Sequence, residues 1–229
     1  MLEMGFYNMD CMDGMREFPD KYFDLAIVDP PYGDASEKFE GGWNRFGGWF
    51  DRYKETDKQD GEQLVEKVRK KIIAWDVAPK DDYFQELFRV SRDQIIWGGN
   101  YFRLPPARCF LIWRKLSISE GFSMAMAEYA WTSFNANAKV FEFTPQGKKD
   151  DPRFHPTQKP VELYQWILAN YAKPGYKILD THVGSASSLI ACHRAGLEYC
   201  GFEIDKEYYK KASERLEREK AQVNIFDLL

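Results

Sequence analysis

Short apolar runs bounded by proline, glycine and polar residues recur along the chain, and this pattern predicts β-strands. The first clear run, over 23–28, stops just before Pro30 and Pro31, because a pair of prolines cannot continue a strand. Apolar residues at helical spacing predict a helix over 83–90. Further strands are expected over 94–97, 109–113, 128–132 and 139–143.

Strands and helices alternate in the last third of the chain. This order and spacing predict parallel strands joined by right-handed crossovers, with a nucleotide-like ligand at the carboxyl ends of the strands. Asp205 is placed to cap the final helix, whose many charged residues we interpret as a solvent-exposed face. The expected elements are a helix over 160–171, a strand over 176–180, a glycine and serine turn over 184–188, a helix ending near 196, a strand over 198–202 and a helix to about 220.

Length and composition favour a single α/β domain over 1–229. The chain has 229 residues, 44% of them hydrophobic and 16% aromatic, which is enough for one sizeable core. The stretch 33–74 is rich in glycine, charge and aromatic side chains, and predicts an inserted loop that carries helical pieces. The stretch 144–154 is polar and predicts a short linker or recognition loop.

Charge, cysteine usage and hydropathy narrow the class of protein further. The net charge is −4, so a polyanionic partner would have to meet a local basic patch. The four cysteines form no C-x-x-C pair and no metal-finger spacing, which favours reduced thiols and no bound metal. The first ten residues do not resemble a secretory leader, and the apolar runs are too short to span a membrane. We therefore expect a cytoplasmic protein.

A glycine turn and an acidic residue stand at the spacing of a nucleoside-binding site. Gly184 lies between a strand and a helix, where glycine lets the backbone approach a ligand. Glu203 follows 19 residues later, and an acid about 20 residues beyond such a turn binds ribose hydroxyls. The alternative role of Glu203 is helix entry beside Asp205. Further glycines for a pyrophosphate are missing, so the pattern favours a nucleoside without phosphates.

The segment Asp29-Pro30-Pro31-Tyr32 follows the first strand. A pair of prolines is commonly only a rigid turn, but the same rigidity would hold a backbone carbonyl in one direction. The exocyclic amine of adenine or cytosine is a poor nucleophile because its lone pair is delocalised into the ring. A carboxylate and a fixed carbonyl that accept its two N–H hydrogens would direct this lone pair at a methyl sulfonium, without any metal. Tyr32 would offer a face to a base turned out of the duplex.

With further motifs in a fixed order, this segment resembles the bacterial and phage DNA amino-methyltransferases. The resemblance is to the permuted kind, in which the catalytic motif precedes the cofactor motif. The motifs that carry it run from Asp10 to Asp205, nearly the whole chain. They are Asp10-Cys11, the DPPY segment over 29–32, IIWGGNYF over 95–102, WTS over 131–133, HPTQKP over 155–160, DTHVGSAS over 180–187 and FEID over 202–205.

The resemblance implies a Rossmann-like S-adenosylmethionine-dependent methyltransferase fold, circularly permuted, with a mostly parallel sheet and an antiparallel edge strand. It implies methyl transfer from S-adenosylmethionine to N6 of adenine in double-stranded DNA, as in restriction-modification systems, and it is compatible with a homodimer. The implied catalytic residues are Asp29, Pro30, Pro31 and Tyr32. The implied cofactor-binding residues are Asp10, Cys11, Asp29, His155, Thr157, Lys159, Asp180, Thr181, Gly184, Ser185, Ser187, Phe202 and Glu203.

The cofactor loop departs from the commoner family pattern D-P-F-x-G-S-G-T at Thr181, His182, Ala186 and Ser187. Ala186 replaces a glycine and restricts the backbone. His182 could contact the cofactor or be a buried structural histidine, and His155 could do either or only fix its turn.

Basic residues on both sides of the motifs are candidates for DNA contact, with solvated surface as the alternative. One group lies in the stretch 33–74 and a second beside the segment near His155. They are Arg45, Arg52, Lys54, Lys70 and Lys71 in the first group, and Lys148, Lys149 and Arg153 in the second.

Other functions remain open from the sequence. Methylation of cytosine N4 uses the same geometry, although Asp29 rather than serine favours adenine in this family. RNA or protein glutamine is a third class of substrate. A catalytically silent DNA-binding subunit is the fourth alternative, but such a subunit would not need Asp29, Tyr32 and Glu203.

Overall fold

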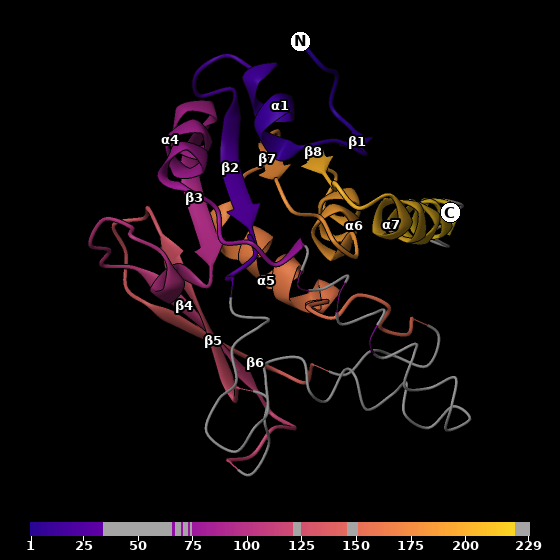
Figure 1. Ribbon diagram of the computed structural model, residues 1–229. Coiled ribbons are helices and arrows are strands. Elements are labelled where there is room, and N and C mark those ends of the chain that lie inside the picture. The colour runs from indigo at the N-terminus through magenta and orange to yellow at the C-terminus, as the bar shows by residue number, and fades with distance from the viewer. Residues whose placement is uncertain are drawn as a thin grey trace.

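A computed structural model describes residues 1–33, 66, 70, 73, 75–120, 125–145 and 151–222. Its centre is a twisted sheet whose eight strands in the described residues run in the order β1-β8-β7-β2-β3-β5-β4-β6 (Figure 1). The strands are β1 (Phe6–Tyr7), β2 (Phe23–Val28), β3 (Ser91–Trp97), β4 (Phe110–Lys115), β5 (Ala127–Thr132), β6 (Lys139–Phe143), β7 (Lys177–Asp180) and β8 (Glu198–Phe202).

The sheet is mostly parallel, but its antiparallel strand is not at the edge. β1, β8, β7, β2 and β3 pair in parallel, as expected for strands joined by helices. β5 runs antiparallel to both β3 and β4, and β6 then pairs in parallel with the far side of β4. The expectation of an antiparallel edge strand is therefore wrong, because two more strands extend the sheet beyond β5.

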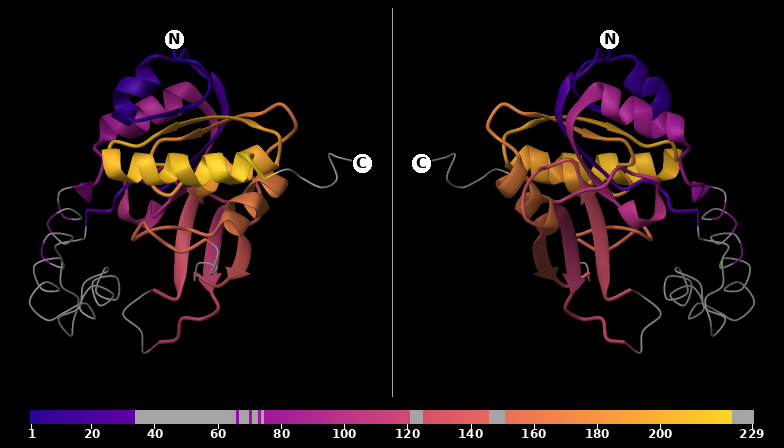
Figure 2. Two further views of the ribbon diagram at one scale, coloured as in Figure 1. Left: turned by 90° about the vertical axis from the view of Figure 1, so that its right-hand side faces the viewer. Right: turned by 90° about the vertical axis from the view of Figure 1, so that its left-hand side faces the viewer.

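Helices cover both faces of the sheet. α1 (Cys11–Arg16) and α4 (Asp81–Val90) pack on one face, and α5 (Val161–Tyr171), α6 (Ser187–Arg194) and α7 (Lys206–Lys220) on the other. The opposite views of Figure 2 show α7 in front in one and α4 in front in the other. A short 3-10 turn over Gly99–Tyr101 follows β3. Among the described helices, none is long and apolar enough to cross a lipid bilayer.

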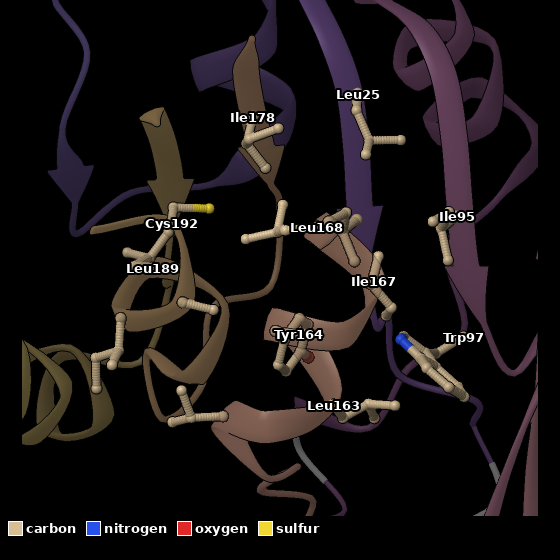
Figure 3. Close-up of a cluster of buried hydrophobic side chains, with 14 of the residues drawn as sticks. Leu25, Ile95, Trp97, Leu163, Tyr164, Ile167, Leu168, Ile178, Leu189 and Cys192 are labelled. Atoms are coloured by element: carbon tan, nitrogen blue, oxygen red, sulfur yellow. The ribbon is translucent and has the colours of Figure 1, made fainter. Parts of the chain in front are cut away.

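Side chains of β2 alternate between the two cores, as the period of two in a strand requires. Leu25 and Ile27 face α5 and α6, whereas Ala26 and Val28 face α1 and α4. Figure 3 shows the first of these cores, in which Ile167 of α5 lies beside Trp97 of β3. Since β2 is covered on both faces, it reads as a continuous apolar run rather than an alternating one.

The expected elements agree with the structure to within a few residues, with two exceptions. β1 and α1, at the start of the chain, were not expected, because a strand of two residues and a helix of six leave little pattern. The other exception is α7, which is not simply a solvent face: Tyr208, Ala212 and Leu216 are buried at helical spacing, and Arg215 is buried with them. Most of the stretch 33–74 lies outside the described residues, as does part of 144–154.

Candidate active site

The carboxyl ends of β2, β7 and β8 meet at a cavity of about 390 Å³. Parallel strands bring these ends to one edge of the sheet, where α/β folds bind ligands. The volume lies in the range of sites for small molecules and cofactors. Of the residues expected at the site, those that line the cavity are Asp10, Cys11, Asp29, Pro30, Pro31, His155, Thr157, Lys159, Thr181, Gly184, Ser185, Ser187, Phe202 and Glu203.

Glu203 marks one end of this cavity. Its carboxylate accepts hydrogen bonds from the backbone N–H of Gly184 (2.9 Å) and from that of Asp205 (2.9 Å). Burial raises the pKa of Glu203 to about 7, although both N–H groups oppose the rise. Each carboxylate oxygen has a second lone pair, so Glu203 can position the helix entry and also accept from a ligand hydroxyl. The two roles considered for this residue are therefore compatible.

Asp10 and Cys11 approach the cavity from the start of α1. The Asp10 carboxylate caps this helix by accepting from the N–H of Met12 (2.7 Å). Burial, with a contribution from Asp10, raises the pKa of Cys11 to about 12, so this side chain remains a thiol. Asp10 can thus hold the helix and still present its other oxygen to a ligand.

Asp29 stands directly after β2, at the opposite end of the cavity from Glu203 along the sheet order. One carboxylate oxygen accepts from the hydroxyl of Tyr32 (2.8 Å). The Tyr32 ring lies outside the cavity lining, stacked on Tyr101 with centroids 4.6 Å apart. Gly98 makes room for this ring: it has φ +68°, and a Cβ here would lie 2.2 Å from the Tyr32 ring.

Lys159 also lines the cavity, but its ammonium is turned to two carboxylates. Nζ lies 2.5 Å from Oδ2 of Asp29 and 3.0 Å from Oε2 of Glu128. Burial opposes the charged form, yet the two carboxylates outweigh it and raise the pKa of Lys159. Lys159 therefore stays charged beside Asp29.

The model of the N6/N4 DNA methylase family matches residues 128–214, which include Glu128, Lys159, the Gly184 turn and Glu203. Over this segment the chain is similar to the DNA methylases of that family. YubD of Escherichia coli (strain K12) is 27% identical to the methylase over 225 residues, which cover 92% of this chain and 89% of YubD.

Two solved structures share the fold of the methylase. One is the PvuII DNA methyltransferase (cytosine-N4-specific), with a TM-score of 0.59 and 12% identity over 94% of this chain and 89% of that one. The other is a complex of M1.HpyAVI with SAM (S-adenosylmethionine), with a TM-score of 0.56 and 16% identity over 93% and 99%. At such identities the likeness extends to the fold alone, which is the expected α/β methyltransferase fold.

Asp180 and His182, at the end of β7, are fixed by their own loop. Asp180 is buried behind the cavity wall, where it accepts from the N–H of His182 and from the hydroxyl of Ser188. Burial raises the pKa of Asp180 to about 6 and lowers that of His182 to about 4. Thr181 bonds to Nδ1 of His182 (2.9 Å) and to the hydroxyl of Tyr83 (2.6 Å). His182 lines the cavity and is neutral at physiological pH.

The loop after β7 carries a strained residue, at the position where the expected family pattern has glycine. Ala186 adopts φ +64°, a left-handed conformation that costs a non-glycine residue about 1–2 kcal/mol. Arg215 of α7 fixes this loop by donating to the carbonyl of Ser185 (2.7 Å) and the hydroxyl of Ser187 (2.9 Å). It also pairs with Asp151 (2.5 Å).

Several supporting residues were not singled out from the sequence. Glu128 pairs with Lys159, Arg215 donates to the loop after β7, and the Tyr83 hydroxyl bonds to that of Thr181. Asp76 accepts from the backbone N–H of Tyr32 (3.2 Å) and so supports the turn that follows β2. All four contact residues at least 30 positions away, and no local motif marks such pairs.

The candidate DNA contacts are described only in part. Lys70 is exposed and lies 3.7 Å from Glu66, one helical turn away. Arg153 donates to the carbonyl of Pro156 (2.9 Å), so part of its guanidinium is engaged within its own loop. Arg45, Arg52, Lys54, Lys71, Lys148 and Lys149 lie outside the described residues.

Proposed function

We propose that this DNA methyltransferase transfers the methyl group of S-adenosylmethionine to N6 of adenine in double-stranded DNA, after the base has turned out of the duplex. One observation carries the proposal: the Asp29 carboxylate and the buried Glu203 carboxylate line the same cavity. A nucleoside site and an acceptor for an amine hydrogen are therefore adjacent.

The residues present fit this cofactor. Glu203 can accept from ribose hydroxyls, and Gly184 lets the backbone approach, since a Cβ here would lie 3.3 Å from the His155 ring. Asp10 and Cys11 lie at the side of the adenine ring in the proposed orientation, with Thr157 and the His155 segment toward the methionine end. S-adenosylmethionine supplies an electrophilic methyl group on a sulfonium.

Asp29 and the Pro30-Pro31 turn act on the amine. The carboxylate accepts one N–H hydrogen and a backbone carbonyl of the turn accepts the other, which concentrates the lone pair of the nitrogen toward the methyl group. With the cofactor bound, the nitrogen would gain the methyl group as the carbon–sulfur bond of the sulfonium breaks and a neutral thioether leaves, and one amine proton would pass to solvent. Tyr32 offers its ring to the extruded base. The DPPY turn precedes the Gly184 loop in the chain, in keeping with a permuted motif order.

The test uses purified protein, labelled S-adenosylmethionine and a random-sequence library of unmethylated duplex DNA, followed by nucleoside mass spectrometry. We expect N6-methyladenine, with much slower labelling when Asp29→Asn replaces the wild type. N4-methylcytosine in its place would establish the cytosine alternative. Binding of DNA and cofactor without methyl transfer, to DNA or to RNA, would refute the enzyme and favour a binding subunit. Sequencing of the methylated library would identify the recognition site.

A further inference from the structure

Four buried or half-buried charges of alternating sign run from the cavity into the sheet: Asp29, Lys159, Glu128 and Lys115. Their contacts are 2.5 Å from Asp29 to Lys159, 3.0 Å from Lys159 to Glu128 and 2.6 Å from Glu128 to Lys115. They come from different elements, namely the turn after β2, the residue before Pro160, β5 and the end of β4. Tertiary packing alone brings them together.

Lys159 is the most enclosed of these groups. It is 4% exposed, and its Nζ lies 5.3 Å from the centre of the Trp97 ring. Two carboxylates and an aromatic face thus surround its ammonium. A buried ion pair is weak evidence for stability, because desolvation offsets much of the attraction. A role at the site explains better why a buried lysine contacts Asp29.

Both oxygens of Asp29 are anchored in this arrangement. Oδ1 accepts from Tyr32 (2.8 Å) and Oδ2 from Lys159 (2.5 Å). Each oxygen can accept a second hydrogen bond, so the carboxylate can still accept from the amine of the base. Two anchors from different directions restrict the carboxylate to one rotamer.

We infer that Lys159 is a positioning residue for methyl transfer, which orients the Asp29 carboxylate, and that Glu128 in turn fixes Lys159. The inference rests on the proposed role of Asp29. It replaces the expected contact of the Lys159 ammonium with the cofactor by a contact with the catalytic carboxylate.

The central variant is Lys159→Met, which keeps the length of the side chain and removes its charge. We expect kcat to fall about 10–100-fold, with less than about threefold change in cofactor affinity. Lys159→Arg should restore most of the lost rate, because arginine keeps the charge and can still donate to Asp29. Lys115→Met is the matched control, since it removes a buried lysine from the same Glu128 without touching Asp29. Its kcat should stay near the wild-type value.

A double-mutant cycle separates positioning from a general loss of structure. In an Asp29→Asn background, Lys159→Met should cause little further loss of kcat, because the group it positions is gone. Equal losses in both backgrounds, or a kcat for Lys159→Met as high as that of Lys115→Met, would overturn the inference. If Lys159→Met fails to fold, Glu128→Gln tests the same row of charges and should give a smaller loss of kcat, again with near-normal cofactor affinity. An unchanged kcat would then refute it. The proposed function itself fails if the wild type forms no N6-methyladenine in DNA, or if Asp29→Asn remains fully active.

Discussion

Replacing Glu203 by glutamine should reduce the dependence of stability on pH. Burial raises the pKa of the Glu203 carboxyl from its ordinary 4.5 to about 7. The side chain is only 9% exposed, so solvent screens this effect little. The folded methyltransferase therefore holds a proton that the unfolded chain releases.

The sign and magnitude follow from this difference. A carboxyl whose folded pKa is raised stabilises the fold fully below pH 4.5, and this contribution is lost as the pH rises to about 7. At 1.36 kcal/mol per pKa unit, the interval between 4.5 and about 7 corresponds to about 3 kcal/mol. The amide of Glu203→Gln does not titrate. Between these two pH values its free energy of unfolding should fall by about 3 kcal/mol less than that of the wild type.

Urea denaturation followed by circular dichroism at several pH values between 4.5 and 7.5 measures this difference. Glu207→Gln is the matched control, because Glu207 lies exposed in the first turn of α7, four residues beyond Glu203. Its curve should follow the wild type. Asp180 titrates in the same window, with a pKa of about 6, but it does so in all three proteins and cancels from the comparison. Parallel wild-type and Glu203→Gln curves would refute the reasoning.

The same variant tests the proposed ribose contact. A carboxylate that accepts from two hydroxyls contributes on the order of 1.5–3 kcal/mol to binding. Calorimetry at pH 8 should therefore show S-adenosylmethionine binding to Glu203→Gln weakened by about 10–100-fold. Wild-type affinity in a folded variant would exclude Glu203 as the ribose acid.

Three further substitutions probe the rest of the site. Asp29→Asn should lower kcat by about 10²–10³ with near-normal cofactor affinity, because its contact strengthens in the transition state; single-turnover kinetics beside cofactor titration would show whether binding is lost instead. Gly98→Ala should displace the Tyr32 ring and lower kcat on the order of 100-fold, and an unchanged rate in a folded variant would mean that this ring position is not used. Arg215→Met should weaken cofactor binding and lower the free energy of unfolding, measured by urea denaturation, by about 3 kcal/mol. Arg218 is exposed, so Arg218→Met should change stability by less than about 0.5 kcal/mol. Equal effects of the two substitutions would contradict the buried role of Arg215.

Much of the fold could be predicted from the sequence, because strands, helices and helix caps are specified by short stretches of the chain. The apolar run over 23–28 became β2, the strands expected over 139–143 and 198–202 became β6 and β8, and Asp205 caps α7 through the N–H groups of Glu207 and Tyr208. The spacing between Gly184 and Glu203 predicted that these two residues lie together, because parallel strands end at one edge of the sheet, and the hydrogen bond between them agrees. Backbone preferences and side-chain periods operate over a few residues, so a pattern of that length reveals them.

Only the tertiary structure decided which distant charges meet. The chain has 32 basic and 36 acidic residues, and no pattern selects Lys159 and Glu128, or Arg215 and Asp151, from so many pairs. The place of β5 inside the sheet likewise depends on β4 and β6 lying beyond it. The sequence by itself therefore determined the elements, the motif order and the cavity edge. Packing determined the partners of the buried charges, because a buried ammonium is stable only where the fold supplies carboxylates to face it.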